Sequence, residues 1–85
     1  MRTIEIQLFG ALREVAPSAS IAIESAAMHV GELREELAAA ASAWPAPARA
    51  LLPRSAFASA TTVLRDADPL PDDGRLALLP PVSGG

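Results

Sequence analysis

The beginning of the chain holds two segments in which apolar and polar side chains alternate. The alternation over residues 3–9 has the period of a strand that buries one face, and residues 21–24 repeat it more briefly. Between them, residues 11–16 predict a short helical turn that ends before Pro17. We expect the two strands to pair antiparallel, through a connection longer than a tight hairpin. The first strand would bury Ile4, Ile6 and Leu8.

A helical period begins at Val30. Apolar residues then recur three or four positions apart, which predicts one amphipathic helix with a buried stripe. His29 stands at the N-cap position, with Glu32 three residues later. Pro45 and Pro47 predict the end of this helix. The stripe consists of Val30, Leu33, Leu37, Ala40 or Ala41, and Trp44.

Prolines, aspartates and glycines divide the second half of the chain. We expect residues 45–54 to form a proline-bearing loop, because they interrupt every regular period. Residues 55–60 and 61–64 predict strand material with a bend between them. Residues 75–80 are mostly apolar and predict the last strand. Turn-forming residues occupy positions 66–69 and 71–74.

The order of these elements is strand, strand, helix and further strands. Such an order is typical of an α+β fold, in which one main helix packs on one face of a small mixed sheet. The first and last strands are separated by enough chain to pair in parallel. We therefore expect these two strands to lie side by side in the centre of the sheet.

Composition narrows the class of protein. Eighty-five residues correspond to one domain, residues 1–85, and 51% hydrophobic with 20% charged residues is typical of a globular chain. The net charge of −3 argues against a nucleic-acid or anionic-membrane surface. No apolar run has the length of a membrane span, and no secretory signal is visible, so we expect a cytoplasmic protein.

The reactive side chains of many enzymes are missing. The sequence contains no cysteine and no lysine, which excludes disulfides, thiolate ligands and lysine Schiff bases. His29 has no second ligand type beside it, so we expect a capping residue rather than a metal ligand. The aspartates are better explained by turns than by cation binding, and we expect no metal site. They are Asp66, Asp68, Asp72 and Asp73.

The chain ends with residues 80–85, Pro-Pro-Val-Ser-Gly-Gly, directly after the last predicted strand. Two glycines at a fixed position arise by chance with a probability of roughly 0.5%, since glycine is about 7% of residues. The prolines favour extended backbone, and the last four residues would reach roughly 13 Å at about 3.3 Å per residue. A backbone without Cβ atoms fits a narrow pocket. The candidate reactive group is therefore the α-carboxylate of Gly85, carried on Gly84.

The phase of the strands suggests where a partner docks. If the strand residues predicted to be buried face the helix, Phe9 and Leu79 face away from it. Val63 would join them in the apolar centre of a docking surface, with Arg13 at its rim. Burial of Phe9 and Leu79 within the domain is the alternative. The tail residues expected to contact a partner are Pro80, Pro81, Val82 and Ser83.

Two motifs together resemble the small subunit of molybdopterin synthase, a family of sulfur carriers. Residues 9–14, Phe-Gly-Ala-Leu-Arg-Glu, are similar to its F-A-x-L-R-E signature, and residues 76–85 are similar to its apolar strand and P-P-V-[ST]-G-G ending. The helix beginning at Val30 fits as well. The resemblance covers the whole chain. One departure is Ala60, which stands where many members have an asparagine.

The resemblance implies a ubiquitin-like β-grasp fold and a non-catalytic sulfur-donor subunit. An adenylating partner with its own ATP and Mg²⁺ would activate the Gly85 carboxylate, because this chain has no phosphate-binding loop. A sulfur donor protein would then form a thiocarboxylate. The large synthase subunit would use that sulfur to build the dithiolene of molybdopterin on a pyranopterin precursor.

Three alternatives remain open. A thiazole-pathway sulfur carrier would share the fold and the tail chemistry, although its members are typically shorter and the two motifs favour the molybdopterin branch. A ubiquitin-like modifier would form isopeptide bonds through Gly85, but without lysine it cannot build lysine-linked chains on itself. In a plain β-grasp interaction domain the Gly-Gly ending would be incidental.

Overall fold

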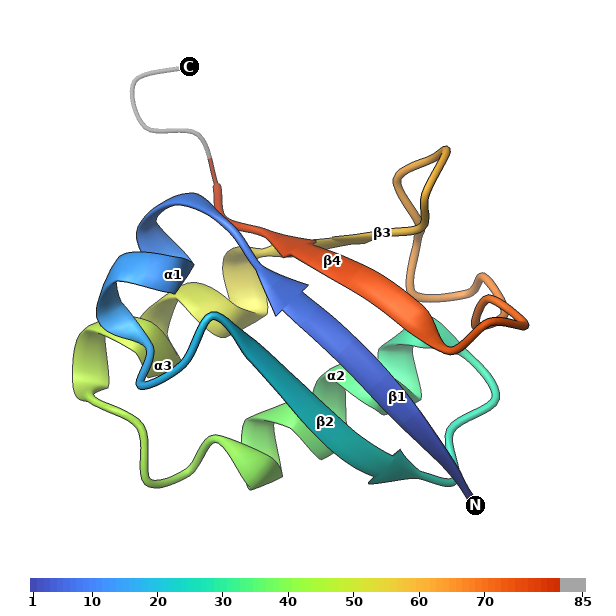
Figure 1. The fold of residues 1–85 in the computed structure, drawn as a ribbon, viewed down its shortest axis with the longest axis horizontal. Helices are drawn as coiled ribbons and strands as arrows, with labels where there is room; N and C mark the ends of the chain where they lie inside the picture. The colour runs from blue at the N-terminus through green and yellow to red at the C-terminus, as the bar shows by residue number, and fades with distance from the viewer. Residues whose placement is uncertain (82–85) are drawn as a thin grey trace.

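The computed structural model describes residues 1–81, which form four strands, three α-helices and one 3₁₀-helix. The strands belong to one sheet, and the helices lie between β1 and β2 and between β2 and β3 along the chain (Figure 1). The elements are β1 (Arg2–Leu8), α1 (Gly10–Val15), β2 (Ser20–Ser25), α2 (Val30–Ala40), α3 (Ala46–Leu51), η1 (Leu52–Arg54), β3 (Ala56–Ala58) and β4 (Arg75–Leu79).

The sheet has the order β2-β1-β4-β3, so the first and last strands form its centre. β1 pairs antiparallel with β2, and β4 pairs antiparallel with β3. The central pair, β1 and β4, is parallel, with Glu5 opposite Arg75 and Leu8 opposite Leu78. The expected central parallel pair and the expected antiparallel pairing of the first two strands are both confirmed.

One face of the sheet forms the core together with the helices. Along β1 every second side chain is buried, as the alternation in the sequence predicts. α2 crosses this face and contributes the helical stripe (Figure 1). The largest fully buried side chains include Phe57, Ile4, Ile6, Leu8, Leu12, Leu33, Leu37, Leu78 and Val30. The fold is therefore α+β, with a mixed sheet, as expected.

The start of α2 is held by backbone and side-chain groups. The Glu32 carboxylate accepts hydrogen bonds from the backbone N–H groups of Met28 and His29, at 3.2 and 3.1 Å, and lies 3.2 Å from His29 Nδ1. The backbone N–H groups of Val30 and Gly31 donate to Asp68 and Asp66 carbonyls. The predicted start of the helix is thus correct, and Glu32 satisfies donors before the first turn.

Arg34 ties three separate segments to α2. Its Nη1 donates to the carbonyls of Ser55, at 2.7 Å, and Leu52, at 3.3 Å. Its Nε and Nη2 donate to Asp66 Oδ1 at 3.2 and 3.0 Å. The guanidinium carbon lies 5.2 Å from the centre of the Phe57 ring, within cation–π range. A planar fork with several donors suits this role better than a lysine would.

The prediction of a loop over residues 45–54 is wrong. This stretch forms α3 and then η1. Pro45 is the N-cap of α3 and Pro47 lies in its first turn, where a missing N–H costs nothing. Pro53 has the same place in η1. The prolines here begin helices.

Two further boundaries differ from expectation. α2 ends at Ala40, so Trp44 lies beyond it in a turn, where its half-buried ring packs against the core. Strand β3 has only three residues. Residues 61–64 form no strand; after β3 the Ser59 hydroxyl accepts from the Thr62 backbone N–H, and Val63 forms only an isolated bridge with Ala58.

We predict that Ile6→Ala lowers the free energy of unfolding by about 2–5 kcal/mol, because it removes a fully buried side chain between sheet and helix. Gln7→Ala, at the next position of β1, faces outward and should change it by no more than about 0.5 kcal/mol. Urea unfolding at neutral pH measures both. Equal effects of the two substitutions would contradict the orientation of β1.

The pKa of Glu32 is lowered, first by the hydrogen bond with the His29 side chain and then by the Met28 backbone N–H. The folded state therefore favours the carboxylate, and this stabilisation is present above the ordinary glutamate pKa and lost as pH falls through the lowered pKa. We predict that Glu32→Gln makes the free energy of unfolding less pH-dependent between about pH 6 and about pH 3. Glu35→Gln, on the exposed side of α2, is the control. Urea unfolding of the wild type and both variants across this range should show a weaker pH dependence only for Glu32→Gln. The same pH dependence in the wild type and in Glu32→Gln would contradict the prediction.

Candidate functional site

The parallel pairing of β1 and β4 makes both strands end at the same edge of the sheet, which we call the exit edge. β4 ends at Leu79, and the chain leaves the sheet through Pro80 and Pro81, which are half-buried. α1 begins at the same edge, directly after β1 (Figure 1). The other predicted tail residues lie outside the described part of the chain, so their roles stay predictions: Val82, Ser83, Gly84 and Gly85.

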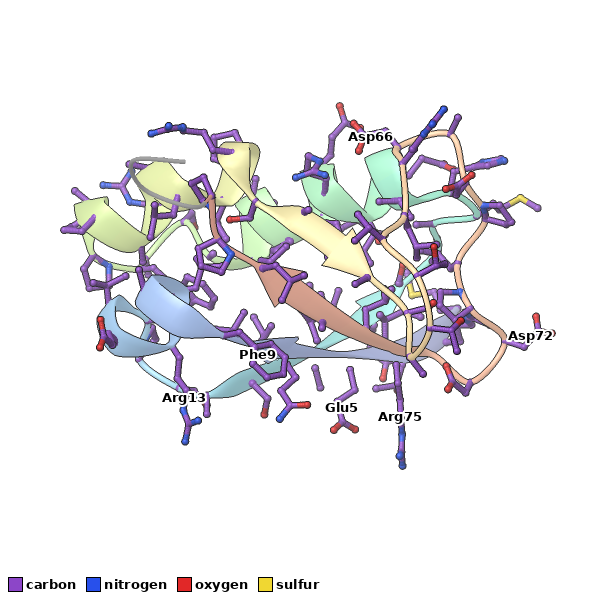
Figure 2. The ribbon with its side chains drawn as sticks, turned by 90° about the horizontal axis from the view of Figure 1, so that it is seen from above. Glu5, Phe9, Arg13, Asp66, Asp72 and Arg75 are labelled. Atoms are coloured by element: carbon purple, nitrogen blue, oxygen red, sulfur yellow. The ribbon has the colours of Figure 1, made fainter. Side chains whose placement is uncertain are left out.

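The side of the sheet that faces away from α2, which we call the open face, divides into two halves. Its polar half lies where β1 and β4 begin: Glu5 is opposite Arg75, and the Thr3 hydroxyl donates to Glu24 at 2.6 Å. Figure 2 shows Glu5 and Arg75 pointing away from the helices on this side. The apolar half lies where the strands end. It consists of outward residues of β4, β3 and the end of β1: Phe9, Ala56, Ala58, Ala77 and Leu79.

Phe9 and Leu79 are the large side chains of the apolar half. Continuing the β1–β4 register by one residue places them next to each other, and the Phe9 N–H donates to the Leu78 carbonyl at 3.3 Å. Phe9 is 38% exposed and Leu79 is half-buried. The expectation that both face away from the helix agrees with this geometry. Burial of Phe9 inside the domain is excluded.

Val63 lies on the same side but is not a neighbour of Phe9. It is 61% exposed and forms a bridge with Ala58, which in turn is opposite Ala77. The β3 strand therefore separates Val63 from β4, by about 10 Å at the usual strand spacing. The outward side chains nearest to Val63 on β3 and β4 are alanines, Ala58 and Ala77, so large apolar side chains are missing from this part of the open face.

Arg13 lies in the last turn of α1 and is exposed. In Figure 2 it points to the same side of the molecule as Phe9, Glu5 and Arg75. It stands beyond the end of β1, so it borders the apolar half at the exit edge. This position fits the expected place of a cation at the rim of a docking surface.

One contact at the exit edge was not anticipated from the sequence. Gly10 has φ +57°, and a Cβ atom placed on it would lie 3.0 Å from Pro80 Cγ. The start of α1 thus lies directly against the residue where the chain leaves the sheet. The signal in the sequence is a glycine between a predicted strand and a predicted helical turn.

Other kinds of site find little support in the part of the chain that the structure describes. Residues 1–81 contain no group of three or more histidines or acidic residues placed to hold a metal ion. None of the helices formed by these residues combines the length and apolarity needed to cross a bilayer. A hollow of about 380 Å³ lies on the helical side, between α2 and the α3–η1 segment, away from the open face.

Comparison with known proteins points to one family. Residues 6–85 match the model of the ThiS family. Among solved structures, the chain is similar to the crystal structure of SAMP1 from Haloferax volcanii, with a TM-score of 0.71 and 23% sequence identity over 99% of this chain and 100% of that one. No curated protein matches the sequence. The structural match confirms the ubiquitin-like β-grasp fold. With 6–85 matched, the chain belongs to the ThiS family of ubiquitin-like sulfur carriers.

Proposed function

We propose that this protein carries sulfur as a thiocarboxylate on Gly85 and delivers it to molybdopterin synthesis. The observation that carries the proposal is the position of the Gly-Gly ending. In the sequence it follows β4 after residues 80–83, and β4 ends at the same edge as β1, beside the apolar half of the open face. A partner that binds this face therefore has the tail within reach of its own catalytic groups. The family match supports a sulfur carrier in general.

Activation of the tail has to be done by a partner. The Gly85 carboxylate attacks the α-phosphorus of ATP, pyrophosphate leaves, and an acyl-adenylate forms. The outer sulfur of a persulfide on the donor protein attacks the carbonyl carbon, AMP leaves, and a thiol of the donor reduces the acyl disulfide to the thiocarboxylate. We assign ATP and Mg²⁺ to the adenylating enzyme, because this chain carries no sequence that binds them. The carrier itself is non-catalytic.

The open face is the proposed docking surface for both partners, the adenylating enzyme and the large synthase subunit. Phe9 and Leu79 supply adjoining apolar area beside the exit edge, and Arg13 adds a charge at the rim. Val63 extends the surface beyond β3. Aromatic and aliphatic side chains in the centre of a patch with charged residues around it are typical of protein interfaces. Since ATP-dependent activation is intracellular chemistry, we propose that the carrier works in the cytoplasm.

The choice of pathway rests on the resemblance of the two sequence motifs to the molybdopterin branch. A thiazole-pathway carrier would use the same tail and the same first two steps, so only the final acceptor separates these functions. The β-grasp fold also serves protein modifiers, and the likeness to SAMP1 is compatible with either class. The experiments below therefore distinguish a molybdopterin carrier from a thiazole-pathway carrier and from a protein modifier.

Incubation with ATP, a persulfide donor and the adenylating enzyme of the same organism should raise the intact mass by about 16 Da, the difference between sulfur and oxygen. Deletion of Gly85 should abolish the shift, because the reacting carboxylate would no longer reach the nucleotide. Intact-protein mass spectrometry measures both. A covalent adduct with other proteins instead of the shift would favour a modifier, and no change at all would contradict activation of the tail.

The acceptor is identified in a second step. The purified thiocarboxylate is mixed with the large synthase subunit and the pyranopterin precursor, or with the enzyme that forms the thiazole. Loss of the added mass only with the pyranopterin system would support the proposed branch. Loss only with the thiazole system would move the protein to the other pathway.

Leu79→Glu should weaken binding to the adenylating enzyme at least tenfold, because it places a charge in the centre of the apolar half. The free energy of unfolding should change little, since the side chain lies on the open face and not in the core. Ala39→Glu adds the same charge on the exposed side of α2 and is the control. Calorimetric titration of both variants measures the affinities. Equal affinities for Leu79→Glu and wild type would remove the open face as the docking surface.

A further inference from the structure

We propose that Gly10 is a positioning residue for the tail. Without a side chain at this position, the Pro80 ring packs directly on the start of α1, and this contact sets the direction in which the chain leaves the sheet. The effect on activation rests on the proposed function. The contact itself is a property of the fold, and it can be tested without any partner.

The β1–β4 ladder brings these two residues together. Leu8 is opposite Leu78, and the Phe9 N–H donates to the Leu78 carbonyl at 3.3 Å, which extends the parallel pairing by one step. The next residue of the first segment is Gly10, where α1 begins. Gly10 therefore meets the chain just where β4 ends and Pro80 follows.

The space between them admits no side chain. A Cβ atom on Gly10 would lie 3.0 Å from Pro80 Cγ and 3.6 Å from Pro80 Cδ. Carbon atoms in ordinary contact are about 3.5–4.0 Å apart, so even a methyl group would push the ring outward. The φ of +57° at Gly10 is a second reason for glycine, because side chains disfavour this conformation.

The ring of a proline includes its backbone nitrogen and Cα, so a shift of the ring also changes the direction of the backbone. Pro80 has no N–H, so it cannot continue the ladder beyond Leu79, and its φ is held near −65° by the ring. A displaced ring therefore turns the backbone that follows it. Pro81 repeats the restriction, and both prolines are half-buried. The direction set at Pro80 is thus kept at Pro81, the last residue that the structure describes.

Gly74 offers a matched comparison within the same molecule. It also has a positive φ, +68°, and a Cβ atom there would lie 3.0 Å from the Thr3 carbonyl oxygen, but Gly74 stands at the opposite end of β4.

The first experiment compares Gly10→Ala with Gly74→Ala by NMR. Both should lower the melting temperature, because both place a side chain at a positive φ against a close neighbour. Only Gly10→Ala should weaken the NOEs between residue 10 Hα and Pro80 Hγ and shift the amide signals of the residues after Pro81. Equal changes of these tail signals in the two variants would overturn the proposal.

The second experiment measures kcat/KM of thiocarboxylation. Gly10→Ala should lower it roughly tenfold, since misplacing a reacting group slows a positioned reaction, and Gly74→Ala should leave it near the wild-type value. In a Pro80→Ala background, which removes the ring atoms, Gly10→Ala should have no further effect. An undiminished effect in that background would overturn the proposal.

The two experiments separate the possible failures. If wild-type protein accepts no sulfur, the proposed function is wrong, while the NMR comparison still decides whether Gly10 positions the tail. If Gly10→Ala does not fold, Pro80→Ala alone gives the answer. It should shift the tail amides with a melting temperature near wild type, and unchanged tail amides would overturn the proposal.

Discussion

The parallel pairing of β1 with β4 is the interaction on which the rest of this structure depends. It joins the beginning of the chain to its last strand and makes them the centre of the sheet. The outer strand β3, the complete buried face under α2 and the exit edge are defined only once this pair has formed. Because parallel strands end at the same edge, the pair also places Pro80, where the chain leaves the sheet, beside the start of α1.

A chain of this length has a small core, and the structure compensates with side chains that connect several segments. Arg34 is the clearest case, since one guanidinium satisfies carbonyls of η1 and of the residue before β3 while pairing with Asp66. Its stacking on Phe57 adds to the same cluster. This cluster connects α2, η1, the start of β3 and the Asp66 turn on the helical side of the sheet.

The sequence predicts the strands and the main helix because their burial has a regular period. Burial alternates along β1 and follows the helical repeat along α2 with few exceptions, and the α+β order of the elements follows from these patterns. The helix over residues 46–51 was not predicted, because its prolines were interpreted as helix breakers, although proline is tolerated in the first turn of a helix. β3 was overestimated because its three residues are followed by others of equal strand propensity.

The candidate site also has some features that the sequence predicts and others that it does not. The outward phase of Phe9 and Leu79 follows from the period of their strands, so it is visible in the sequence. The separation of Val63 from them depends on the turn after β3 and on tertiary pairing, for which the sequence has no local signal. The contact between Gly10 and Pro80 needs both the register and a dihedral angle, and neither can be deduced from composition.

The central position of the last strand has a consequence for folding. Before β4 docks, the chain can form the β1–β2 hairpin and α2, but β1 lacks its second neighbour and closing the sheet requires the longest loop in the molecule. A molecule stopped at that stage has neither an exit edge nor an open face. If the open face is the docking surface, as proposed above, a misfolded or truncated copy would present no surface to an activating enzyme and would not be adenylated, so folding would select which copies are activated.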